Sequence, residues 1–219
     1  MLVGHIAAGF IGNRLAPRTS LGTVVMASLA ADLLWGALLL AGIELVEFRA
    51  GHTTQDSLLA SQISFSHSLV MDALWASVFA AMYFAIRNRR RGAWVLFAAV
   101  LSHWLLDFVS HRPDMPLVPG VHAYFGLRLW DSVAATIVVE GGLWMVAVLI
   151  YVRTTSPRRA AGAMAFWGGV LLFTAVWWNN VAGPPPPANV RGLGFSSLLF
   201  FGLVTAWAYW IDRLRAAVR

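Results

Sequence analysis

The sequence contains no cysteine and no lysine, and only 12% of its 219 residues carry a charge. Without cysteine, the chain can form neither a disulfide framework nor a thiolate metal site, and it has no cysteine nucleophile. The charged fraction is far below the roughly 25% of ordinary soluble domains. Because 59% of the residues are hydrophobic, a single soluble core cannot bury them all.

Six apolar stretches are each close to the ~20 residues that a transmembrane helix needs. They lie at 21–43, 65–86, 93–110, 132–152, 160–178 and 193–211. Little of the chain is left for a soluble domain. The sequence therefore predicts an all-α polytopic membrane protein of about six transmembrane helices, forming a single membrane domain over 1–219.

All sixteen basic residues are arginines, and the net charge is +6. Twelve of them fall in alternate connections and in the tail: Arg14 and Arg18, four in 87–92, three in 153–159 and three in 213–219. The other four are Arg49, Arg112, Arg128 and Arg191, and most loop acids, including Glu44 and Glu47, share their side. The positive-inside rule places the arginine-rich side and both termini in the cytoplasm. This role explains the basic charge, so no nucleic-acid partner is expected.

The N-terminal apolar segment Leu2–Asn13 is short. As a helix it covers about 18 Å, against a hydrocarbon core of about 30 Å. It either enters half of the membrane and carries His5 near the midplane, or lies at the interface with His5 at the surface. Both alternatives stay open.

Ionisable residues also occur inside the predicted spans or at their ends, and inside the membrane a charge costs several kcal/mol or more and usually marks function. They are Asp32, His67, Asp72, His103, Asp107, His111 and Glu140. His103 and Asp107 are four residues apart, so a helix projects them from one face. In the absence of thiolates, imidazole and carboxylate are ligands for zinc, manganese or iron.

We expect a shared polar site formed by Asp32, His67, His103 and Asp107, joined by His5 if the N-terminal helix enters the membrane. Its cofactor would be a divalent metal, zinc first and manganese or iron as alternatives. Asp72, His111 and Glu140 would support the ligands or line a pathway, and Arg112 would pair with an anionic headgroup or extend to the interface. Each buried residue alone could instead join neighbouring helices by hydrogen bonds.

Five short motifs follow one another in residues 1–120. They are GH at 4–5, AAD at 30–32, SHSL at 66–69, SHWLLD at 102–107 and PLVPG at 116–120. In this order they resemble the YdjM-like family, small bacterial inner-membrane proteins classed as metal-dependent hydrolases. The resemblance implies that the metal ligands are His5, Asp32, His67, His103 and Asp107. Residues 121–219 would then supply supporting helices.

Two motifs depart from the family pattern. Leu34 and Trp35 stand where the P-D-x-D-H motif has its second Asp and its His, and ISFSHS at 63–68 replaces H-R-G-x-T-H-S. Fewer ligands remain, so a one-metal site and a degenerate, non-catalytic site both stay open. The order of ligands also resembles, more remotely, that of zinc-dependent phospholipase C, which suggests a phosphoester or a lipid headgroup as substrate.

The leading hypothesis is a membrane-embedded metal-dependent hydrolase of the bacterial inner membrane, acting on an ester or phosphoester that can be lipid-derived. No catalytic side chain is identified, and a metal-bound water is the expected reactive group. The principal alternative is a small permease or ion-coupled carrier that uses the same intramembrane His, Asp and Glu residues as a path. A structural subunit of a larger membrane assembly is the third.

Overall fold

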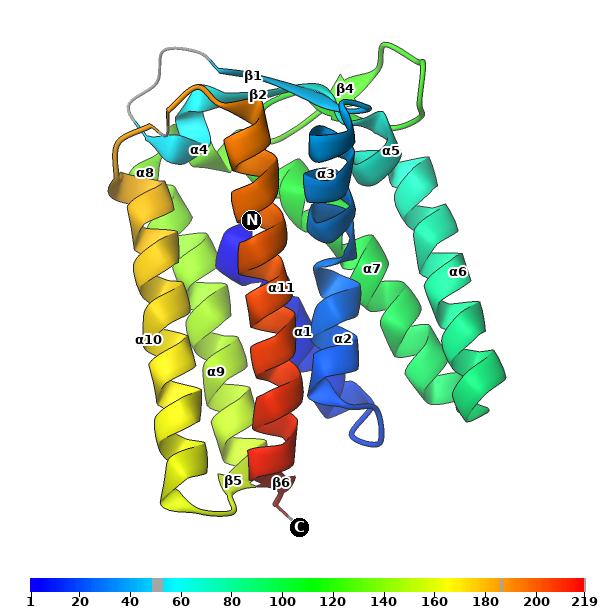
Figure 1. The fold of residues 1–219 in the computed structure, drawn as a ribbon, viewed down its shortest axis with the longest axis vertical. Coiled ribbons are helices and arrows are strands. Elements are labelled where there is room, and N and C mark those ends of the chain that lie inside the picture. Colours follow the sequence, from blue (N-terminus) through cyan, green and yellow to red (C-terminus); the bar gives the residue numbers. More distant parts are fainter. Residues whose placement is uncertain (49–52, 186, 219) are drawn as a thin grey trace.

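The computed structural model of the chain describes residues 1–48, 53–185 and 187–218 and shows a helical bundle (Figure 1). The α-helices are α1 (Leu2–Leu15), α2 (Leu21–Ser28), α3 (Ala30–Ala41), α4 (Thr54–Ser57), α5 (Ser64–His67), α6 (Leu69–Arg87), α7 (Arg90–Ser110), α8 (Val133–Thr136), α9 (Gly142–Thr154), α10 (Ala160–Ala182) and α11 (Val190–Leu214). A 3₁₀ turn, η1 (Leu129–Asp131), precedes α8, and a π-helical turn, η2 (Ile137–Gly141), joins α8 to α9. Three antiparallel pairs complete the fold: β1 (Leu45–Phe48) with β2 (Leu58–Gln62), β3 (Met115–Pro116) with β4 (Tyr124–Phe125), and β5 (Thr155–Pro157) with β6 (Arg215–Ala217).

Among the described residues, five helical segments are long and apolar enough to cross a membrane: α6, α7, the run Val133–Thr154, α10 and α11. Helices α2 and α3 make a sixth when taken together, although they are bent by 56°. The chain is therefore an all-α polytopic membrane protein, and the prediction of about six spans is confirmed. The span predicted over 21–43 is a broken one, because the chain turns at Leu29.

The connections predicted to be arginine-rich gather at one end of the bundle, at the bottom of Figure 1. Arg89 Nη1 donates to the carbonyl of Arg18 at 2.5 Å and so joins two of these connections. We call this the arginine end. The β1–β2 pair covers the opposite end, which we call the hairpin end. Arg49 and Arg219 lie outside the described residues, and the assignment of the arginine end to the cytoplasm stays a prediction.

Helix α1 lies inside the bundle, packed against α2, α7 and α9, and its N-terminus is midway along the long axis (Figure 1). Eight of its 14 residues are buried, and Ile6 and Phe10 are fully enclosed. The interfacial alternative is therefore wrong, since His5 is only 2% exposed. A short helix can be buried in this way because α2, α7 and α9 pack around it.

Small residues allow the close approach of α1 to α2. A Cβ atom added to Gly9 would lie 2.8 Å from Val25 Cγ2 and 2.9 Å from Val25 Cα, so a backbone would have to move. Close contact through glycine is a common way of packing helices in membranes.

We expect Gly9→Ala to lower the free energy of unfolding by about 1–3 kcal/mol, because the added methyl group overpacks this contact. Gly168→Ala in α10 is the matched control, since a Cβ there has nothing within 4 Å among the described residues. It should instead stabilise its helix by up to about 1 kcal/mol through helix propensity. Thermal unfolding in detergent measures both, and equal shifts in the two variants would contradict the close α1–α2 contact.

Candidate metal centre

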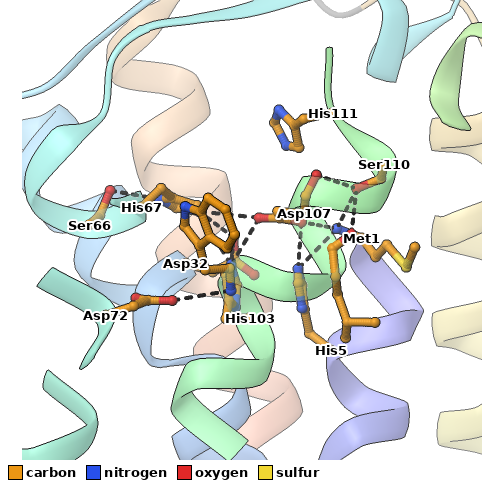
Figure 2. A network of polar contacts seen from close by, with 12 residues as sticks. Met1, His5, Asp32, Ser66, His67, Asp72, His103, Asp107, Ser110 and His111 are labelled. Carbon is orange, nitrogen blue, oxygen red and sulfur yellow. Dashed lines mark hydrogen bonds and ion pairs between the residues drawn. The ribbon is translucent and has the colours of Figure 1, made fainter. Parts of the chain in front are cut away.

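The five residues predicted as metal ligands meet in the interior of the bundle, on four separate elements. His5 comes from α1, Asp32 from the first turn of α3, His67 from the end of α5, and His103 and Asp107 from α7. Each is at least nine-tenths buried. Figure 2 shows their polar ends pointing toward one another.

The ligand atoms lie close enough to share one small ion. His103 Nε2 is 3.3 Å from both His67 Nε2 and Asp107 Oδ2, and 3.8 Å from Asp32 Oδ1. His67 Nε2 is 3.8 Å from Asp32 Oδ1 and 3.7 Å from Asp107 Oδ2. His103 and Asp107 are one helical turn apart, and their contact confirms the prediction that they share a face of the helix.

The bend between α2 and α3 orients His103. Its Nδ1 is 3.0 Å from the carbonyl oxygen of Ser28, the last residue of α2. A carbonyl can only accept, so Nδ1 must carry the hydrogen. In the neutral ring Nε2 then has a free lone pair, and this atom faces the cluster.

A second chain of hydrogen bonds orients His67. The hydroxyl of Ser66 donates to Glu44 Oε2 at 2.5 Å. The hydroxyl oxygen, Ser66 Oγ, is also 2.7 Å from His67 Nδ1. Because the hydroxyl hydrogen is used on Glu44, His67 Nδ1 donates to Ser66 Oγ. His67 Nε2 is thereby assigned as a second free lone pair that faces the cluster.

Two lone pairs and two carboxylate oxygens therefore face one another in a buried space. Acceptors that meet at 3.3 Å repel unless a proton or a metal ion lies between them. Histidines that bind a metal through one ring nitrogen usually donate the N–H of the other to a carbonyl or a carboxylate. His103 and His67 are held in this way, by the Ser28 carbonyl and by the Ser66–Glu44 pair. The described residues contain two groups able to hold a metal ion: Asp32 with His67 and His103, and His5 with His103 and Asp107.

His5 is placed differently from the other two histidines. Its ring stacks on His103 with centroids 3.6 Å apart, and its Nε2 is 3.1 Å from Asp107 Oδ1. The amino group of Met1 also contacts Asp107 Oδ1 and is 3.0 Å from His5 Nε2. No described residue makes a hydrogen bond with His5 Nδ1. Among the described residues, no acceptor holds a hydrogen on His5 Nδ1 and so leaves Nε2 free to bind a metal. His5 is instead suited to orienting Asp107 through Nε2.

Glu44 was not identified from the sequence, which placed it among the loop acids. It is 1% exposed, and its Oε1 accepts from the backbone N–H groups of Phe65 and Ser66, each at 2.8 Å. A carboxylate at the start of α5 satisfies donors that a helix terminus leaves open. Glu44 could have been recognised only from its burial near His67, and the sequence does not show which loop acids are buried.

Asp72 supports α7 and does not reach the cluster. Its Oδ2 accepts from the backbone N–H of Trp104 at 3.1 Å, next to His103 in the chain. The span predicted over 65–86 is present, but its long helix begins only at Leu69, because the chain breaks at Ser68. Ser68 caps α6 through its hydroxyl, leaving His67 on the separate turn α5. The extended backbone of Ser68, with ψ near 145°, redirects His67 toward the cluster.

Glu140 likewise lies away from the metal ligands. It is fully buried in η2, and its Oε1 accepts from the N–H of Gly4 at 3.3 Å. Gly4 is in the first turn of α1, where backbone donors have no partner in the helix. Glu140 therefore stabilises the buried start of α1, and a negative charge is favourable at that end of a helix.

His111 and Arg112 lie at the hairpin end of α7. His111 Nδ1 is 3.1 Å from Asp114 Oδ1, and its ring contacts Trp130. Arg112 Nε donates to Asp131 Oδ1 at 3.0 Å. A hydrogen bond from Arg128 and then the charge of Arg112 hold the pKa of Asp131 below its usual value. Arg112 is thus part of a surface ion pair with Asp131. The sequence predicted either an anionic headgroup as its partner or an extension to the interface, and did not include this ion pair.

A cavity of about 420 Å³ opens above the cluster. His5, Asp32, His67 and Asp107 form part of its wall, and the remainder is mostly apolar. Its size is within the range of small-molecule sites, and an apolar wall with a few convergent polar groups is typical of them. The carboxylate oxygen Asp32 Oδ2 is buried and has no hydrogen-bond partner among the described residues.

The chain matches no family model, no curated protein and no solved structure. The geometry of the buried His/Asp cluster is therefore the basis on which function is inferred.

Proposed function

We propose that the protein is a membrane-embedded, metal-dependent hydrolase that acts on an ester or phosphoester. One observation carries the proposal: the Nε2 atoms of His67 and His103 face each other at 3.3 Å while both Nδ1 atoms are held by other groups. Two carboxylate oxygens approach the same space. A bound cation would relieve the repulsion between these acceptors.

The donor set fits zinc. His67, His103, Asp32 and Asp107 would hold the ion, and His5 would orient Asp107 from its other side. In a tetrahedral site with ligand distances of about 2.0–2.1 Å, neighbouring ligand atoms are about 3.3–3.4 Å apart. The five distances from His67 Nε2 and His103 Nε2 to each other and to the nearest carboxylate oxygens, 3.3 to 3.8 Å, are close to this value. Manganese and iron take the same ligand types and remain the alternatives.

A metal ion supplies Lewis acidity toward an ester or phosphoester oxygen and brings the pKa of water toward neutrality. The residues of the chain prepare the site for this chemistry. Ser28 and the Glu44–Ser66 pair fix the imidazoles, and the apolar walls of the cavity exclude bulk water. A water-poor site strengthens the electrostatic interactions made within it.

The resemblance of the five motifs to the YdjM-like family supports the same function and a location in a bacterial inner membrane. The gathering of the arginines at one end supports an orientation with that end in the cytoplasm. A reporter fused at residue 90 should then be active only as a cytoplasmic reporter. Periplasmic activity of that fusion would reverse the orientation.

Metal analysis of the purified wild-type protein tests the proposal. After expression with zinc, manganese and iron supplied, we expect close to one equivalent of a transition metal per chain, removable by a chelator. A folded protein that contains none of the three would refute the hydrolase.

A further inference from the structure

The cavity above the cluster lies between the hairpin-end halves of α10 and α11. Nearer the arginine end these helices are in contact: Trp207 Nε1 donates to the carbonyl of Ala165 at 3.0 Å, and the Trp207 ring packs edge-on against Phe173 at 4.9 Å. Nearer the hairpin end, Val176 of α10 and Leu193 of α11 line the cavity instead. The cavity therefore lies between these two helices beside the metal centre.

The hairpin end of the cavity is covered. Val46 of β1, Gln55 of α4 and Ile63, which follows β2, line it and are each less than one-tenth exposed. This cover lies across the end of the bundle that would meet water (Figure 1). A direct path along the bundle axis is thus narrowed by buried side chains.

The side of the cavity between α10 and α11 reaches the molecular surface at Ser196. Of its described lining residues, only Ser196 on α11 is exposed. Ser196 is six residues from the start of α11, or about 9 Å along the helix at 1.5 Å per residue, which is inside the depth of a bilayer. Its hydroxyl donates to the carbonyl of Leu193 at 3.0 Å, so this donor is satisfied within the helix and can face lipid. The neighbouring Phe195 and Leu199 are 62% and 51% exposed, as expected at a surface that faces lipid.

From this geometry, and resting on the proposed function, we propose that the substrate is a membrane lipid with a single apolar chain in the cavity. The lipid would pass sideways between α10 and α11 beside Ser196. Its ester or phosphoester would lie against Asp32, His67 and Asp107, and its chain would contact the apolar wall that includes Trp35, Val176 and Phe200. A hydrophilic ester that diffuses from water does not require a side opening at this depth.

The test uses hexadecylphosphonic acid, whose carbon–phosphorus bond is not hydrolysed, and methylphosphonic acid as the same headgroup without the chain. Binding to the full-length protein is measured by native mass spectrometry from detergent. Ser196→Trp and Val176→Trp fill the opening from its two sides. Ala206→Trp is the matched control, because Ala206 is an exposed small residue of α11 that does not line the cavity.

We expect the wild type and Ala206→Trp to bind hexadecylphosphonic acid equally, and each blocking variant to bind it about tenfold more weakly or worse. Methylphosphonic acid at equal concentration should not displace it. Equal binding by all four proteins would refute the lipid site, and displacement by methylphosphonic acid would identify a soluble substrate instead.

Metal content measured on the same samples separates this inference from the proposed function. Normal metal with binding unaffected by the blocking variants overturns the lipid site alone. Chain-dependent binding without any metal overturns the hydrolase and leaves the lipid site standing. Gel filtration shows whether each variant is folded, and two blocking variants on different helices guard against the failure of one.

Discussion

His103→Asn should abolish high-affinity metal binding, with a loss of more than about 100-fold, the upper range for residues that only support a ligand. Asparagine can donate from its amide to the Ser28 carbonyl, as His103 Nδ1 does, but it has no atom at the position of Nε2. The variant therefore removes the central contact of the cluster while it keeps the bond to the bend between α2 and α3. Competition with a chromogenic chelator measures the affinity.

The matched control for His103→Asn is His122→Asn, since His122 lies in an exposed connection at the hairpin end. It should bind metal as the wild type does. If hydrolytic activity is found, it should fall in parallel with metal content in His103→Asn alone. Full metal occupancy in a folded His103→Asn protein would show that the ion is held elsewhere.

Glu44→Gln should weaken metal binding by about 10–100-fold, although Glu44 touches no metal ligand atom of the cluster. Glutamine can keep one oxygen for the N–H groups of Phe65 and Ser66, but its amide nitrogen must then face Ser66 Oγ. The Ser66 hydroxyl would turn and donate to His67 Nδ1. His67 would change tautomer and present an N–H, in place of a lone pair, to the cluster.

The tautomer of His67 is a readout that a merely structural role would not move. Nitrogen NMR of metal-free protein should show the hydrogen on Nδ1 in the wild type and on Nε2 in Glu44→Gln. Glu47→Gln, the same change at an exposed position three residues away, should leave both the tautomer and the metal affinity unaltered. A Glu44→Gln protein with the wild-type tautomer would refute the relay through Ser66.

The candidate ligands could be found from the sequence because ionisable groups in apolar helices are costly and conspicuous. Their pairing could be predicted only where it is local. His103 and Asp107 share a face because the helical repeat puts them there. The approach of His5, Asp32 and His67 to this pair depends on contacts between segments up to about a hundred residues apart, which no periodicity records.

Tertiary structure also decided which polar residues support the site. Asp72, Glu140 and Glu44 are all buried acids, yet each accepts from a different backbone N–H and none contacts the imidazoles of the cluster directly. The sequence separated Glu44 from the others because it lies outside the apolar stretches. Its burial follows from the pairing of β1 with β2, which brings Glu44 beside the start of α5.

The sequence by itself determined that this is an all-α protein of about six membrane spans, because hydropathy over some twenty residues is a local property that decides whether a helix can replace water by lipid. It also determined which side chains would be expensive to bury there. Only the tertiary structure decided that α1 enters the bundle, that the chain bends at Leu29 and breaks at Ser68, and that a cavity lies between α10 and α11 beside the cluster. These features are set by packing between distant segments, and they turn isolated polar residues into one buried site next to an apolar cavity.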